Sequence, residues 1–197
     1  EEYQQSKTHY ENAANLLKSS KRWSYLAANF SAWATLEQAE DQTKKEKSDE
    51  SRQAFQLAAN QFGEAKASLE EEAKKIEDPD EKAKTIELSE ASEPRREYCL
   101  ARAELEEAKI HDKNEDHGAS AKKYSEVAQR FEKIAEKLED EPDRNELLFQ
   151  AHLCRALEKM ELAHEKADPA LYAEASELFT NTQKITTKKR NSLLTLG

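Results

Sequence analysis

Two histidine–aspartate pairs around a polar turn are the side chains of this sequence best suited to bind a metal ion. His111-Asp112 and Asp116-His117 flank the turn, which is followed by Gly118, and together they offer nitrogen and carboxylate ligands for a divalent ion. Structural zinc usually takes four Cys or His ligands at closer spacing. No His-Glu-x-x-His motif is present. We therefore interpret the two pairs as a solvated turn and predict no metal site.

A Glu-x-x-His motif, Glu161-Leu-Ala-His164, is the second feature with possible chemistry. Four-helix di-iron carboxylate proteins use two such motifs facing inward, and this chain has one. The acidic runs 70–72, 106–107 and 139–141 fit the solvated faces of helices better than paired acid catalysis. No glycine-rich phosphate loop and no Ser-His-Asp arrangement is found. We predict that the protein is not an enzyme and has no cofactor, with a helical metal-binding, ferritin-like protein as an alternative.

Composition favours an acidic helical protein. The chain has 197 residues, 37% of them charged and 37% apolar, with 3 Gly, 4 Pro and a net charge of −10. The negative charge disfavours nucleic acid as a partner, because phosphate contacts need clustered Lys and Arg. No run of about 18 apolar residues indicates an integral membrane segment. Cys99 and Cys154 lie far apart in apolar stripes, which is typical of buried free thiols in a reducing, cytoplasmic setting.

Helix formers dominate the sequence, and prolines mark most of the predicted boundaries. Asp168-Pro169 predicts a helix start, whereas Asp78-Pro79 and Glu141-Pro142 predict breaks. We expect helices near 2–18, 22–42, 49–76, 94–112, 117–139, 144–166 and 169–190, with a short one near 80–90. Val127 is the only valine, so little material favours strands.

Four octets starting at Tyr10, Phe55, Tyr124 and Tyr172 share one pattern. Each has an aromatic residue, small or apolar residues three and four positions later, and a bulky apolar residue seven positions later. This spacing places the four side chains on one helix face, where small residues allow close approach and large ones fill the gaps. The octets and the tryptophans predict a core of Tyr10, Trp23, Phe30, Trp33, Phe55, Phe62, Tyr124, Phe131, Tyr172 and Phe179.

A second pattern begins at Phe30, Cys99 and Cys154. A small residue follows two positions later, a bulky one six later and a small one nine later. Pairing each of these helices with the next octet predicts three hairpins, at about 22–76, 94–139 and 144–190, after an N-terminal helix at 2–18. We expect a single helical-repeat domain over 1–197.

The octet resembles the second helix of a tetratricopeptide repeat, in which large and small residues alternate at intervals of three, four and three. Phe55, Ala58, Phe62 and Ala65 fit this pattern fully. Successive octets lie farther apart than the period of about 34 residues in that family, so these helices are longer than standard ones or carry insertions. The resemblance implies an all-α fold of antiparallel helical hairpins stacked as a right-handed α-solenoid.

The N-terminal third is similar to the opening of the soluble NSF attachment protein (SNAP) family, over about residues 3–65. The similarity is carried by Tyr10, Ala13-Ala14-Asn15, Lys18, Lys21, Trp23-Ser24, Phe30, Ala34, Leu36, Ala54-Phe55, Ala58, Asn60 and Phe62. It implies a protein that binds a bundle of fusion proteins and recruits an AAA+ ATPase.

The function predicted from these features is that of a non-catalytic adaptor that holds a peptide or helix of a protein partner in a concave groove. The first helix of each hairpin would face the groove. Arg102, Arg155 and Lys159 are the predicted contacts with an acidic partner. A structural bundle or an oligomerisation module of a larger assembly is the alternative, and the oligomeric state stays open.

Overall fold

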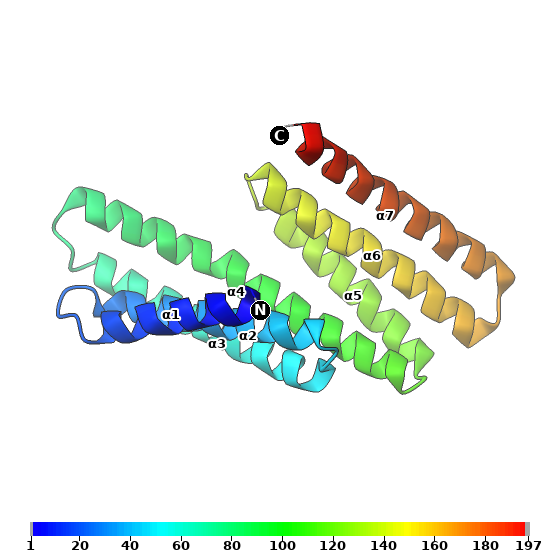
Figure 1. Cartoon of the computed structure of the whole chain (residues 1–197), viewed down its shortest axis with the longest axis horizontal. Helices are drawn as coiled ribbons and strands as arrows, with labels where there is room; N and C mark the ends of the chain where they lie inside the picture. Colours follow the sequence, from blue (N-terminus) through cyan, green and yellow to red (C-terminus); the bar gives the residue numbers. More distant parts are fainter. Residues whose placement is uncertain (1, 196–197) are drawn as a thin grey trace. The chain divides into compact units, whose positions relative to one another are not determined.

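The chain is all-α. The computed structural model describes the backbone of residues 2–195 and the side chains of residues 2–184. Seven α-helices, one 3₁₀ helix and no strand occur in this part of the chain (Figure 1). The elements are α1 (Glu2–Lys18), η1 (Ser24–Leu26), α2 (Ala27–Lys44), α3 (Ser48–Ala73), α4 (Pro79–Lys113), α5 (His117–Ala135), α6 (Glu141–Lys166) and α7 (Pro169–Thr195).

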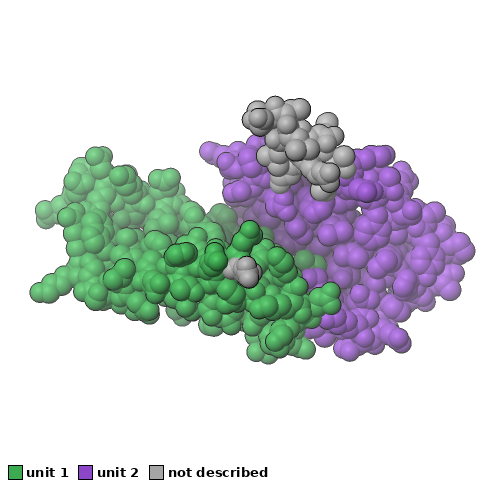
Figure 2. Space-filling view, viewed as in Figure 1, with its two compact units in different colours: residues 1–106 green, residues 107–197 purple. Residues whose placement is uncertain are grey.

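Two compact units make up the chain, residues 1–106 and residues 107–197 (Figure 2). In unit 1, α1 packs on α2 and α2 packs on α3. In unit 2, α5 packs on α6 and α6 on α7. The boundary falls within α4, so the part of this helix from 79 to 106 belongs to unit 1. The single repeat domain that the sequence suggested stays a prediction.

Helix α4 corrects the prediction of a short helix at 80–90 and a new start at 94. It runs through Pro94 without interruption. Proline lacks the amide that would bind the carbonyl four residues earlier, which normally favours a break. Here Ser92 and Cys99, seven positions apart, are both fully buried, so the same helix face is packed on either side of Pro94. Tertiary burial therefore outweighs the local penalty.

Helix starts follow the aspartates that cap them. The side chain of Asp116 accepts a hydrogen bond from the amide of Ala119 at 3.3 Å, and Asp140 accepts one from Asp143 at 3.1 Å. Asp168 accepts one from Ala170 at 2.9 Å, which confirms the predicted helix start at Asp168-Pro169. Each cap satisfies an amide that the first helical turn leaves free.

The predicted core is confirmed at four positions, only partly buried at five and wrong at one. Phe55, Phe62, Tyr124 and Phe131 are at most 2% exposed. A second group, partly buried, consists of Tyr10, Trp23, Phe30, Trp33 and Phe179. Tyr172 is 45% exposed, because the buried stripe of α7 runs instead through Ala175 and Thr182.

The turns that join α2 to α3 and α4 to α5 have the same geometry. Each contains one residue with φ of 58°, Glu46 in the first turn and Glu115 in the second. In each, the next amide donates to the carbonyl five residues earlier at 3.0 Å, from Lys47 to Gln42 and from Asp116 to His111. Glu46 and Glu115 therefore mark equivalent positions from which the rest of each turn can be aligned.

Two buried serines extend this correspondence into the helices that follow. Ser51 donates its hydroxyl to the carbonyl of Ala39 at 3.0 Å, and Ser120 donates to the carbonyl of Ala108 at 3.1 Å. Both serines are fully buried. Each lies five positions after the positive-φ residue of its turn, so the two turns and the helix ends around them can be compared residue by residue.

Candidate functional site

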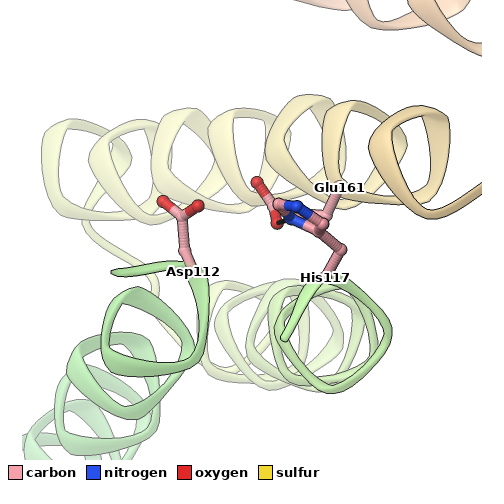
Figure 3. Close-up of side chains that lie close together, drawn as sticks. All are labelled: Asp112, His117 and Glu161. Atoms are coloured by element: carbon pink, nitrogen blue, oxygen red, sulfur yellow. Dashed lines mark hydrogen bonds and ion pairs between the residues drawn. The ribbon is translucent and has the colours of Figure 1, made fainter. Parts of the chain in front are cut away.

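Three side chains from three helices meet beside the α4–α5 turn in unit 2. Asp112 lies in the last turn of α4, His117 is the first residue of α5, and Glu161 lies on α6 (Figure 3). One potential ligand atom from each lies within 4.8 Å of the others. The short turn fixes Asp112 and His117 five residues apart, and the packing of α6 on α5 brings Glu161 to them.

Glu161 is the most unusual member of this group, because it is a fully buried carboxylate. Its Oε2 and the Nδ1 of His117 lie 2.9 Å apart and share a hydrogen bond. Its Oε1 is buried and has no hydrogen-bond partner among the residues that the structure describes. A buried polar atom without a partner costs on the order of 1–3 kcal/mol and more when it is charged, so the site as it stands is incompletely satisfied.

The acidic surroundings act directly on His117. The hydrogen bond to Glu161 is the main cause that raises the pKa of His117 above its ordinary value, and the charges of Asp112 and Glu115 act in the same direction. A ring held next to two carboxylates can keep a proton between them or give up that proton to a metal ion.

His164 joins the site from α6, three residues after Glu161. Its ring meets that of His117 edge-to-face, with 5.0 Å between centroids, and lies 5.5 Å from the ring of Tyr172. The Glu-x-x-His motif therefore lies beside Asp112 and His117, one residue from each histidine–aspartate pair. The other residue of each pair lies outside this group, where the Nδ1 of His111 is 3.4 Å from an oxygen of Asp116.

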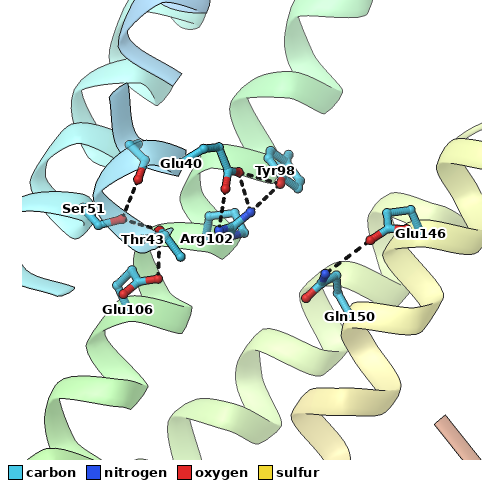
Figure 4. Close-up of polar contacts among 9 residues, drawn as sticks. Glu40, Thr43, Ser51, Tyr98, Arg102, Glu106, Glu146 and Gln150 are labelled. Atoms are coloured by element: carbon cyan, nitrogen blue, oxygen red, sulfur yellow. Dashed lines mark hydrogen bonds and ion pairs between the residues drawn. The ribbon is translucent and has the colours of Figure 1, made fainter. Parts of the chain in front are cut away.

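A second buried glutamate, Glu106, lies under the corresponding turn of unit 1. It is 1% exposed, so the prediction that the run 106–107 is solvated is wrong for this residue. The hydroxyl of Thr43 donates to its Oε1 at 3.2 Å and lies 2.6 Å from the hydroxyl of Ser51 (Figure 4). A neutral hydroxyl thus donates to this carboxylate, whereas an acid and an imidazole lie beside Glu161.

Arg102, a predicted partner contact, lies instead inside unit 1. It is 9% exposed, and its Nη2 donates to Glu40 at 2.9 Å while its Nη1 donates to the hydroxyl of Tyr98 at 2.6 Å (Figure 4). The guanidinium also lies 4.6 Å from the ring centre of Phe55. Burial alone would lower the pKa of Arg102, but Tyr98 and Glu40 outweigh it and raise the pKa. The structure therefore gives Arg102 an internal role.

Burial changes the acidity of the two residues next to this ion pair. It raises the pKa of Tyr98, although the charge of Arg102 opposes the effect. It also raises the pKa of the Cys99 thiol to about 12. Because the thiolate is the reactive form of cysteine, Cys99 is chemically quiet in the folded protein.

Arg155 and Lys159, the other two predicted contacts, are about one-third exposed and join neighbouring helices of unit 2. Arg155 pairs with Glu132 at 3.2 Å and with Glu158 at 3.3 Å. Lys159 pairs with Glu174 at 2.9 Å. A role for these two in binding a partner stays a prediction.

A shallow polar depression of about 340 Å³ lies on unit 1, where α1 meets α2. Thr35 and Gln38 of α2 and Lys7 and Glu11 of α1 are among its lining residues. Its walls offer hydrogen-bond donors, acceptors and charges of both signs.

None of the helices in the described part of the chain combines the length and the apolar character needed to cross a membrane. No protein-family model matches the chain, no curated protein matches its sequence, and no solved structure matches its fold.

Proposed function

We propose that the protein is a non-catalytic adaptor for protein–protein interaction, made of antiparallel helical hairpins stacked as a tetratricopeptide-like right-handed α-solenoid. The observation that carries the proposal is the correspondence between the α2–α3 and α4–α5 turns. A positive-φ residue, the same backbone hydrogen bond and a buried serine recur in the same order in both turns. Recurrence of a whole helix-turn-helix unit is how helical-repeat proteins are built.

Burial of the octet aromatics in both units supports this architecture. Phe55 and Phe62 in unit 1 correspond to Tyr124 and Phe131 in unit 2, and all four are at most 2% exposed. Each pair lies seven residues apart on the second helix of its hairpin. A repeated large–small–large stripe is what allows successive hairpins to stack.

The N-terminal third supports the SNAP-like version of the proposal. Three aromatics on which the resemblance depends, Tyr10, Phe30 and Phe62, form one cluster with Trp33. Tyr10 stacks on Trp33 at 5.8 Å and lies 6.3 Å from Phe30, and Phe62 meets Trp33 edge-on at 5.6 Å. These aromatic contacts hold α1 against the first hairpin.

The partner surface that we propose is the polar depression between α1 and α2. It lies on α2, the first helix of the first hairpin, as the repeat architecture requires. Because its walls are polar and partly charged, the partner would be a helix or an extended peptide with polar side chains. Charge complementarity would determine its selectivity and its association rate.

The experiment is co-purification of the full chain with a purified AAA+ ATPase of the SNAP-binding type, in the ATP, ADP and nucleotide-free states. Thr35→Arg fills the depression, whereas Gln56→Arg adds the same charge at an exposed position of α3. We expect the ATPase to be retained by the wild type and by Gln56→Arg, and lost with Thr35→Arg. No retention in any nucleotide state would contradict the SNAP-like version of the proposal, and equal retention by both variants would contradict the depression as the surface that binds the ATPase.

A further inference from the structure

We propose that Asp112, His117 and Glu161 form a binding site for one divalent transition-metal ion. The proposal is independent of the adaptor function, because it concerns three side chains of unit 2 and needs no partner protein. It is carried by three observations: the spacing of the ligand atoms, an unpartnered buried oxygen, and the contrast with the corresponding position in unit 1.

The spacing fits three ligands of one ion after a small adjustment. Two ligand atoms of the same ion, each at about 2.1 Å, lie about 3 Å apart when adjacent and about 4.2 Å apart when opposite. Nδ1 of His117 and Oε2 of Glu161 are 2.9 Å apart, which is the adjacent distance. All three ligand atoms lie within 4.8 Å, so a small shift of the half-buried Asp112 side chain closes the site.

The unpartnered oxygen of Glu161 indicates that a positively charged ligand belongs at this site. Oε1 of Glu161 is buried without a hydrogen-bond donor, although most buried polar atoms in proteins have one. In Figure 3 the carboxylate of Glu161 extends from α6 to the His117 ring, with its oxygens on the side facing Asp112. A cation bound there would satisfy the buried carboxylate and would also offset the charge of Asp112.

In unit 1 a threonine, Thr43, stands beside the buried glutamate at the position that Asp112 occupies in unit 2. Thr43 and Asp112 occupy the same position, three residues before the positive-φ residue of each turn. Glu106 and Glu161 each follow a buried cysteine by seven positions. Thr43 donates a hydrogen bond to Glu106. Asp112 has no proton to donate when it is ionised, and two carboxylates at one site repel each other unless a cation lies between them.

The donor set determines the class of metal. One imidazole nitrogen and two carboxylates suit Zn²⁺, Mn²⁺, Fe²⁺ or Co²⁺, whereas Ca²⁺ takes six to eight oxygen ligands. Three protein ligands leave at least one position for water or for a fourth ligand. His164 lies on the same face of α6 as Glu161, next to the ring of His117, and offers a further nitrogen for the coordination.

The experiment is calorimetric titration of the metal-free full chain with ZnCl₂, followed by Co²⁺ titration monitored by visible absorption. Asp112→Thr installs the unit 1 residue, and Glu161→Gln keeps the shape of the buried side chain. His152→Ala is the control, because His152 is exposed and lies outside the group. Circular dichroism of each variant shows whether it remains folded.

We expect the wild type and His152→Ala to bind one Zn²⁺ per chain with equal affinity. Asp112→Thr and Glu161→Gln should each weaken binding by at least about 100-fold, since removal of a second-shell partner alone costs about 10–100-fold. If Glu161→Gln unfolds, Asp112→Thr still decides, because Asp112 is only half-buried. Absence of stoichiometric zinc binding by the wild type, or unchanged affinity in Asp112→Thr, would overturn the proposal.

Discussion

Glu106 and Glu161 are buried carboxylates at corresponding positions, but different side chains surround them. Each is a buried carboxylate, seven positions after a buried cysteine, next to a helix–helix turn of the same backbone geometry. In unit 1 the turn supplies Thr43, whose hydroxyl donates to Glu106. In unit 2 it supplies Asp112 and His117, and one oxygen of Glu161 has no hydrogen-bond partner within the described part of the chain.

The same turn geometry can therefore place either a hydrogen-bond donor or a second acid beside a buried carboxylate, depending on a few side chains. In unit 1 the Thr43 hydroxyl donates a hydrogen bond to Glu106, and the Ser51 hydroxyl lies beside that of Thr43. The acid and imidazole of unit 2 instead leave a charge that a cation would balance. Since Glu161 is buried without full satisfaction, the arrangement is destabilising by itself and is best explained by a ligand.

The largest loss of stability should come from substitutions that test whether the octets of the two units play the same structural part. Phe62→Ala and Phe131→Ala each remove a fully buried ring at corresponding octet positions. Each substitution should lower the free energy of unfolding by about 3–5 kcal/mol, because it leaves a cavity in a packed core. Urea denaturation measures both. A cost near zero for one of the two would show that the octets do not play the same part.

The next prediction compares two ion pairs, a buried one in unit 1 and a partly exposed one in unit 2. Glu40→Ala leaves Arg102 buried without its carboxylate partner and should cost about 3 kcal/mol. Glu132→Ala removes a partner of the partly exposed Arg155 in unit 2 and should cost at most about 1 kcal/mol. Equal costs in urea denaturation would contradict the contrast between a buried and a surface pair.

A reciprocal exchange tests the two glutamates directly in the absence of metal. Thr43→Asp removes a donor and places a second acid beside buried Glu106, so it should lower the free energy of unfolding by about 2 kcal/mol. Asp112→Thr removes an acid beside Glu161 and should raise that free energy by about 0.5 kcal/mol at low salt. Thermal and urea unfolding of both variants would refute the comparison if each lost the same stability.

The smallest expected effect is a pH dependence of the folding stability that arises in unit 1 alone. Asp41 accepts hydrogen bonds from Lys45 and Gln4, both at 2.6 Å, and the bond to Lys45 is the main cause that lowers the pKa of Asp41. A carboxyl whose pKa is lower in the folded state stabilises the fold at neutral pH and loses that effect as the pH falls through its folded-state value. Ile110 occupies the corresponding position in unit 2.

Asp41→Asn measures this dependence. The wild type should be more stable than the variant at about pH 7, and the difference should shrink as the pH falls below about 3.9, the ordinary pKa of an aspartate. A difference that stays constant as the pH falls would show that the charge of Asp41 does not stabilise the fold.

The sequence was sufficient for the fold class and for most of the core, because helical periodicity depends on local spacing. The octet aromatics Phe55, Phe62, Tyr124 and Phe131 are buried as predicted. The break near Pro94 was wrong, since packing on both sides of the proline is not visible in a local pattern. Tyr172 was also placed wrongly, because which face of the last helix is covered depends on its register against α6.

The candidate site could be predicted only in pieces. The turn residues His111, Asp112, Asp116 and His117 and the Glu161-x-x-His164 motif were both recognised, but as separate weak signals. Their meeting depends on how α6 packs on α5, because His117 and Glu161 are distant in the sequence. The available signal was the shared spacing of seven positions from Cys99 to Glu106 and from Cys154 to Glu161. Arg102 was misassigned because nothing local reveals that Glu40 neutralises it.

The most direct test of the contrast between the two glutamates is a crystal structure of the zinc-treated protein with anomalous diffraction at the zinc edge. The account predicts one strong anomalous peak within about 2.2 Å of ligand atoms from Asp112, His117 and Glu161, and none beside Glu106. A structure without a peak at Glu161, or with an equal peak at Glu106, would contradict it.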